Sequence, residues 1–267
     1  MNDFCSIVDE GYIQRAVVFH KSLESWCKPY HWYVLALDEK TATTLSKLDH
    51  VTVEGYGDWC PFSLDIPTAT RKAEGLLDWN VFIWALKPVW LSYLLDNVGL
   101  SAVSYIDADC YFFGSPDELF DEIGDALLAV TPHRFSPEQE RFSVNGKYNG
   151  GFIHAKRSSV ALECMLEWTD VCAAHGNGKH TEQKYLDTWP GKWGAHVIKH
   201  VGVDLAPWNQ AGQYTYTCKD GRVYVDGSPL IFYHFHQRLK PHYPINKFVL
   251  DFIYGVYEMM LDTWEVE

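Results

Sequence analysis

The sequence is poor in basic residues and lacks long apolar runs. It has 22 Lys and Arg against 35 Asp and Glu, which gives 267 residues a net charge of -13. A chain this acidic is a poor match for nucleic acid or an anionic membrane surface. No apolar stretch is long enough to span a bilayer, and the N-terminus lacks the pattern of a signal peptide. We therefore expect no nucleic-acid partner and no membrane span, although one pocket can still bind phosphate through a metal or a Lys.

Paired cysteines are also missing. The seven cysteines are odd in number and form no C-x-x-C pair. These features argue against a disulfide framework and against a zinc ribbon. They favour a reducing compartment, so we expect a cytoplasmic protein.

Short apolar runs alternate with segments of helical period along the chain. The pattern predicts strands at residues 4–8, 31–37, 51–53, 101–106, 126–130, 151–155 and 230–235. It predicts helices at residues 12–26, 71–95, 158–174, 181–189 and 246–262. The opening order of strand, helix and strand indicates a mostly parallel sheet with helices on its faces. Since there is no repeat or linker, we expect an α/β fold in one domain, residues 1–267.

Some local features carry more specific expectations. Pro88 is expected to break or kink its helix. Ser115 is expected to cap a helix, with Glu118 completing a capping box. The polar segment 131–147 suits a loop or a lid, and Asp-Gly pairs predict turns at 220–221 and 226–227.

Two carboxylates follow a buried strand in the segment YIDADCYFF. Asp107 and Asp109 are two residues apart, and in a strand such residues point the same way. Ligands of parallel sheets gather at the carboxyl ends of strands, and two carboxylates suit Mg²⁺ or Mn²⁺. The motif alone also fits a solvated strand end, but its flanks are apolar, and buried charges are costly unless they are paired.

With these residues in place, the sequence resembles the GT-A nucleotide-sugar transferases, and among them the retaining enzymes of glycosyltransferase family 8 and their bacterial and viral relatives. The resemblance covers nearly the whole chain as an ordered set of motifs. It implies a GT-A fold with a Rossmann-like sheet and a metal-dependent transfer of a sugar from a nucleoside diphosphate, with UDP expected. It also implies that Asp107 and Asp109 bind Mn²⁺ or Mg²⁺, with Asp107 near the ribose.

The first half of the chain holds two further motifs of the resemblance. In SIVDEGY, Asp9 and Tyr12 correspond to residues that hold the base and ribose, although an ordinary strand-to-helix turn explains them equally well. In FIWALKPVW, Lys87 corresponds to a basic residue near the donor phosphates. A Lys within such an apolar run also needs a partner.

The middle of the chain supplies the residues expected around the sugar. The segment YNGGFIHAK resembles a motif in which Asn149 binds the donor sugar and glycines allow close backbone approach. The segment TEQKYLDTW implies that Glu182 and Gln183 lie near the anomeric centre. The family usually has Asp-Gln there, so the longer Glu182 puts its contact with the sugar in question.

Near the C-terminus, the segment FYHFHQRLKP completes the resemblance. It implies that His234 is the third metal ligand and that Lys240 contacts the diphosphate. Gln237 stands where the family has Gly, which weakens the alignment of this loop. His236 has the same strand facing as His234 and is a competing ligand.

Three other functions fit parts of this pattern. Haloacid-dehalogenase-type phosphatases carry Asp-x-Asp after a strand, but here Cys110 and Tyr111 follow the motif. Sugar-nucleotide pyrophosphorylases have a Gly-rich basic loop after the first strand, whereas SIVDEGYIQRA has only Gly11 and Arg15. A carbohydrate-binding pseudo-enzyme would not need both aspartates. A transferase acting on a glycan, a lipid-linked sugar or a protein acceptor fits best.

Overall fold

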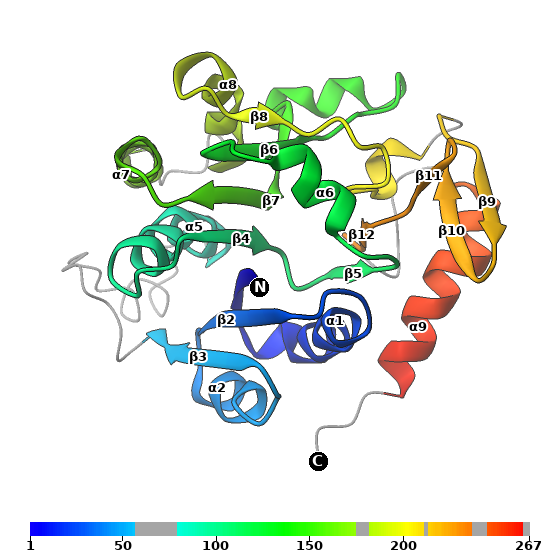
Figure 1. Ribbon diagram of the computed structural model, residues 1–267, viewed down its shortest axis with the longest axis horizontal. Coiled ribbons are helices and arrows are strands. Elements are labelled where there is room, and N and C mark those ends of the chain that lie inside the picture. The colour runs from blue at the N-terminus through cyan, green and yellow to red at the C-terminus, as the bar shows by residue number, and fades with distance from the viewer. Residues whose placement is uncertain (57–78, 175–181, 211–212, 237–244, 264–267) are drawn as a thin grey trace.

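The mostly parallel sheet predicted from the sequence forms the centre of the molecule (Figure 1). A computed structural model describes residues 1–56, 79–174, 182–210, 213–236 and 245–263. Within them, seven strands follow the order β3-β2-β1-β4-β7-β6-β8. Strand β7 is antiparallel to both of its neighbours, and the other pairs are parallel. The strands are β1 (Asn2–Val8), β2 (Tyr30–Ala36), β3 (Val51–Gly55), β4 (Ala102–Ile106), β6 (Leu128–Pro132), β7 (Tyr148–Lys156) and β8 (His196–Val197).

Helices cover both faces of this sheet (Figure 1). The described helices are α1 (Ile13–Trp26), α2 (Glu39–Leu45), α5 (Trp79–Asp96), α6 (Asp117–Ile123), α7 (Ser159–Ala174), α8 (Trp189–Lys192) and α9 (Gly255–Asp262). The alternation of side chains along β1 shows how the faces are divided. Cys5 and Ile7 of β1 belong to the core under α5 and α7, whereas Phe4 and Val8 belong to the core under α1 and α6.

Two small sheets extend the fold at one side (Figure 1). Strand β5 (Cys110–Phe112) pairs antiparallel with β12 (Phe232–His234). Strands β9 (Tyr216–Lys219), β10 (Arg222–Val225) and β11 (Ser228–Pro229) form an antiparallel meander. Both predicted Asp-Gly turns are confirmed, since all four of their residues have positive φ, between 48° and 84°.

Two local expectations were wrong in part. Pro88 lies inside α5, which continues to Asp96, so the proline does not end the helix. Ser115 Oγ accepts a hydrogen bond from the N–H of Asp117 at 3.3 Å, as a capping serine would, but α6 begins at Asp117 with Pro116 at the N-cap and Glu118 does not complete a capping box. Glu118 instead lies 3.0 Å from His200, which occupies the carboxylate that the capping box would have needed.

Other boundaries moved by a few residues or changed helix type. The expected helix 181–189 is a 3₁₀ helix, η3 (Glu182–Thr188), followed by α8. The expected closing helix begins as a π-helix, η5 (Val249–Tyr254), and continues as α9. The segment 131–147 contains the 3₁₀ helix η2 (Glu140–Asn145), and further 3₁₀ turns are η1 (Glu10–Tyr12) and η4 (Pro207–Asn209).

The six described cysteines are all free. Across the described part of the chain, no helix combines the length and the apolar character that crossing a membrane requires. The first eight residues of the predicted helix 71–95 lie outside the described residues.

Candidate functional site

A cavity of about 470 Å³ lies where β1 and β4 end and β7 begins. Because β7 runs opposite to its neighbours, its first residues lie at the same edge as the carboxyl ends of β1 and β4. The cavity brings together nine residues predicted from the sequence. They are Asp9, Tyr12, Lys87, Asp107, Asp109, Asn149, Glu182, Gln183 and His234. The tenth, Lys240, lies outside the described residues.

The two aspartates lie in a turn between β4 and β5, and this corrects the strand geometry expected for them. The backbone N–H of Cys110 donates to the carbonyl of Asp107 at 3.0 Å, which closes the turn around Ala108. The N–H of Asp107 donates to the carbonyl of Gly151 at 3.0 Å, which ties the turn to β7. The turn, not the alternation of a strand, brings both carboxylates to the cavity.

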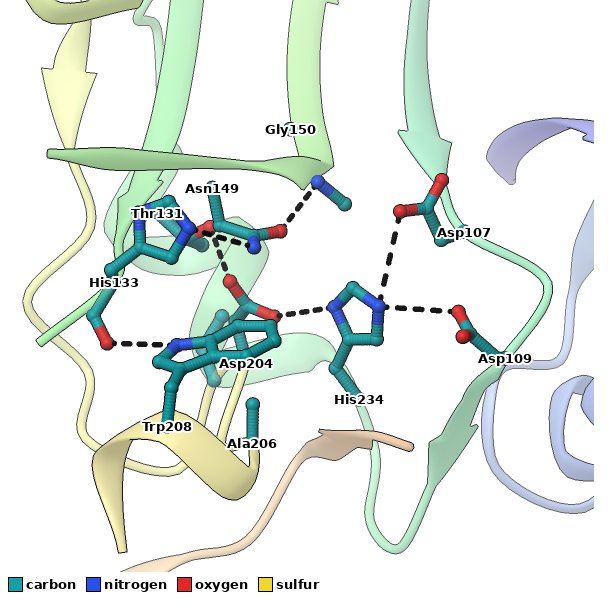
Figure 2. Close-up of polar contacts among 12 residues, drawn as sticks. Asp107, Asp109, Thr131, His133, Asn149, Gly150, Asp204, Ala206, Trp208 and His234 are labelled. Carbon is teal, nitrogen blue, oxygen red and sulfur yellow. Dashed lines mark hydrogen bonds and ion pairs between the residues drawn. The ribbon is translucent and has the colours of Figure 1, made fainter. Parts of the chain in front are cut away.

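His234 lies with Asp107 and Asp109 on one side of its ring and Asp204 on the other (Figure 2). Its Nε2 is 3.1 Å from Asp109 Oδ1 and 3.9 Å from Asp107 Oδ2. The pairing of β12 with β5 fixes this position, because it places His234 directly opposite Cys110. The three side chains therefore come from segments more than a hundred residues apart, joined by one short antiparallel ladder.

Electrostatics ties Asp109 to His234. Burial alone would raise the pKa of Asp109, but the charge of His234 and its hydrogen bond lower that pKa to about 2. Burial alone would lower the pKa of His234, yet Asp109, followed by Asp204, raises it well above its usual value. Without a metal, the two groups form a buried ion pair that requires a proton on the imidazole.

The donor atoms fit a divalent cation. Asp109, Cys110 and His234 each offer one ligand atom, and these atoms lie within 4.8 Å of one another. Burial raises the pKa of the Cys110 thiol well above its usual value, so the thiol stays protonated and is a weak ligand. Asp109 and His234 then remain, and Asp107, whose Oδ2 lies 3.9 Å from His234 Nε2, adds a second carboxylate. Two carboxylates and one imidazole suit Mn²⁺ or Mg²⁺.

Lys87 is buried beside the aspartates. Its Nζ lies 3.0 Å from Glu182 Oε1 and 3.4 Å from Asp107 Oδ1, and it donates to the carbonyl of Gly150 at 3.0 Å. Burial would lower the pKa of Lys87, but the charges of Asp107 and Glu182 raise it above its usual value. The hydroxyl of Tyr105 also donates to Asp107 Oδ1 at 2.8 Å. The Lys87 ammonium group thus orients two carboxylates, that of Asp107 in the turn and that of Glu182 in η3.

The start of β7 presents polar groups to the cavity. The side chain of Asn149 accepts from the N–H of Gly151, and its amide nitrogen lies 3.2 Å from His133 Nε2. The N–H of Gly150 donates to Gln183 Oε1 at 3.1 Å. Gly151 is needed for close packing, because a Cβ there would lie 2.6 Å from His234 Cε1. The sequence predicted that these glycines allow close approach to the backbone, and at Gly151 the group that approaches is the His234 ring.

Asp9 and Tyr12 lie at the outer part of the cavity. Tyr12 is 40% exposed, and the guanidinium of Arg15 lies 4.5 Å from its ring centroid. Burial, and then the charge of Asp109, raises the pKa of Tyr12 to about 12. The tyrosine therefore stays neutral and offers an aromatic surface to a ligand.

Several cavity residues were not found from the sequence. His133 and Trp208 line the cavity, and the Trp208 ring meets His234 and His236 edge-on, at centroid distances of 5.2 and 5.7 Å. Asp204 lies behind His234 and is fully buried. Its one sequence signal is an acidic residue between Val203 and Leu205, both apolar, which indicates a buried charge that needs partners.

Solved structures with a similar fold include glycosyltransferases. The galactosyltransferase LgtC, solved with donor and acceptor sugar analogs, shares 15% identity and a TM-score of 0.65, over 99% of this chain and 97% of that chain. The glycosyltransferase GlyE of Streptococcus pneumoniae TIGR4 shares 15% identity and a TM-score of 0.56, over 99% of this chain and 64% of that chain. At these identities the likeness shows the fold, and the expected GT-A fold is confirmed.

Sequence comparison then places the chain among its relatives. It is 31% identical over 244 residues to YfnD of Bacillus subtilis (strain 168), covering 87% of this chain and 76% of that protein. It is 30% identical over 287 residues to YfnF of the same strain, covering 97% of this chain and 91% of that protein. The chain belongs to the family of these two proteins, both described as uncharacterized. No protein-family model matches the sequence.

Proposed function

We propose that this protein is a metal-dependent glycosyltransferase that moves a sugar from a nucleoside diphosphate, with UDP as the expected nucleotide, to a hydroxyl acceptor. One observation carries the proposal: Asp107, Asp109 and His234 converge at the edge of the sheet, beside the buried cation Lys87. The likeness in fold to LgtC and GlyE, which are glycosyltransferases, supports the same class of reaction.

The proposed metal ligands are Asp107, Asp109 and His234, with Mn²⁺ or Mg²⁺ as the ion. Bound there, the ion would supply Lewis-acid neutralisation of the diphosphate, which makes the nucleotide a better leaving group. The chain itself contributes fixed positive charge through Lys87, which is held in place before the substrate arrives. Lys240 is proposed to add a second positive charge, as expected from the sequence.

The other cavity residues suit the rest of the donor. Tyr12 offers an exposed aromatic surface to the base, and Asp9 lies beside it for the ribose. Asn149, Glu182 and Gln183 face the cavity near Lys87 and suit the hydroxyls of the sugar. Glu182 is the longer acid in place of the family's Asp, and its carboxylate meets Lys87 at 3.0 Å.

Retention of the anomeric configuration is the proposed stereochemical outcome. Glu182 is buried and ion-paired, so it is poorly placed to act as a free base. A departing phosphate oxygen can take the acceptor proton instead.

The proposed acceptor is a glycan, a lipid-linked sugar or a protein side chain. The proposed compartment is the cytoplasm, where free thiols such as buried Cys5 persist. The extent of the domain, residues 1–267, also stays a prediction.

Asp109→Ala tests the proposal. The variant should lose Mn²⁺-dependent hydrolysis or transfer of UDP-sugars, measured as UDP release, while its circular dichroism spectrum stays unchanged. Asp125→Ala is the matched control, because Asp125 is an exposed acid that pairs with Lys156 away from the cavity. Full activity of Asp109→Ala, or of the wild-type protein in excess chelator, would show that the reaction does not use this metal site.

A further inference from the structure

A second buried carboxylate lies behind His234, on the side opposite the cavity aspartates (Figure 2). Asp204 has no solvent exposure. Its Oδ1 faces His234 Nδ1 at 3.5 Å, and its Oδ2 accepts a hydrogen bond from the Thr131 hydroxyl at 2.7 Å. Within the described residues, neither Asp204 Oδ1 nor His234 Nδ1 makes a hydrogen bond at this spacing. Each atom is therefore a buried polar group whose charged partner is the other.

The backbone fixes Asp204 in this place. Its φ is +55°, a left-handed conformation that costs energy for most side chains and that Asp and Asn tolerate best. The N–H of His234 donates to the carbonyl of Leu205 at 2.7 Å, and the Asn209 amide donates to the carbonyl of Asp204 at 3.4 Å. The segment carrying the carboxylate is thus joined directly to the strand carrying the imidazole.

We propose that Asp204 is a positioning residue that holds the His234 ring through Nδ1, so that Nε2 faces Asp107 and Asp109. The inference rests on the proposed metal function, since it assigns a task to the far side of a proposed metal ligand. A carboxylate behind a metal-binding His fixes the tautomer and the ring orientation and makes the free nitrogen a better ligand. Thr131 holds the second oxygen of Asp204 and prevents the carboxylate from turning away.

Two variants remove these contacts with little change in shape. Asp204→Asn keeps the size and tolerates the positive φ, but removes the charge. Thr131→Val keeps the volume and removes the hydroxyl. We expect Asp204→Asn to lower the affinity for Mn²⁺, measured by isothermal titration without nucleotide, by about 10- to 100-fold. Thr131→Val should lower it in the same direction and by less.

Ser104→Ala is the matched control. Ser104 Oγ lies 2.9 Å from Nδ1 of His154, a buried histidine that does not line the cavity. The control therefore loses a buried hydroxyl beside a histidine, and its thermal stability should fall as that of Thr131→Val does. Its affinity for Mn²⁺ should equal that of the wild-type protein, which separates positioning of the ligand from general stability.

The outcomes separate this inference from the proposed function. If the wild-type protein binds Mn²⁺ and Asp204→Asn binds it equally well, the inference is overturned and the proposed function stands. If Asp109→Ala binds Mn²⁺ as the wild-type protein does, the proposed metal site fails. A metal-free measurement then decides the inference: the ¹H–¹⁵N NMR signal of His234 Nδ1–H should shift in Asp204→Asn and stay in place in Ser104→Ala. An unshifted signal in Asp204→Asn would overturn it.

Discussion

The buried cation Lys87 should be one of the largest single contributors to stability in the cavity. At an effective dielectric constant of about 20, charges separated like Lys87 Nζ and its two carboxylates attract by about 5 kcal/mol per pair. Burial offsets much of this attraction. Removal of one partner from a buried ion pair costs about 3–5 kcal/mol, because the remaining charge loses both water and its counter-charge.

Lys87→Met keeps the length of the side chain and removes the charge, which takes the counter-charge from the buried Glu182 and the nearest cation from Asp107. We expect the free energy of unfolding to fall by about 3–5 kcal/mol. That is a large part of the about 5–15 kcal/mol typical of folded proteins. Urea unfolding followed by circular dichroism, in buffer with chelator, measures the change without interference from bound metal.

Two further variants sharpen this test. Adding Glu182→Gln to Lys87→Met removes one unpaired charge, so the double variant should be more stable than Lys87→Met alone. Lys156→Met is the control, because Lys156 pairs with Asp125 at 2.9 Å with side chains 40% and 105% exposed. Exposed pairs contribute about 0–1 kcal/mol. If Lys87→Met costs no more than this control, Lys87 does not neutralise the two carboxylates.

Two other predictions concern packing and acid stability. Gly151→Ala places a Cβ 2.6 Å from His234 Cε1, so it should lower the free energy of unfolding in urea by about 1–3 kcal/mol and weaken Mn²⁺ binding. Gly191→Ala is the control and should change neither quantity, because a Cβ there has nothing within 4 Å. A Gly151→Ala protein that matches Gly191→Ala in both measurements would refute the close packing. Burial lowers the pKa of His154 to about 4 in the folded protein, below the value of about 6.5 in an unfolded chain. As the pH falls from 6.5 toward 4, His154 is therefore protonated in the unfolded chain before it is protonated in the folded protein, and stability is lost. Between pH 7 and 4.5 the wild-type protein should lose about 2 kcal/mol more than His154→Gln; equal losses would show that His154 is not buried as a neutral group.

The sheet could be predicted from the sequence because its strands are short apolar runs. Strands of a parallel sheet that is covered by helices on both faces have this continuous apolar character. Prediction from the sequence failed where tertiary contacts outweigh local preference. Pro88 stays within α5, where its neighbours Leu86 and Trp90 are buried in the core. Glu118 carries the right spacing for a capping box but pairs with His200, which lies far along the chain.

The site was predictable where side chains of unusual type interrupt apolar segments. Asp107, Asp109 and Lys87 are charges in buried surroundings, and each has a partner in the structure. The turn that orients the aspartates could not be foreseen, because an i and i+2 pair fits a strand equally well. Asp204 was missed because its partner His234 is thirty residues away (about a tenth of the chain), and no local period connects them.

The pairing of β5 with β12 has a consequence for how the protein is made. A chain emerges from the ribosome with its N-terminus first, so Asp107 and Asp109 are available long before His234. Until β12 has been synthesised, β5 lacks its partner strand and the aspartates lack the imidazole. A nascent chain therefore cannot bring Asp107, Asp109 and His234 together, and the proposed ion can contact all three only after the early and late segments have joined.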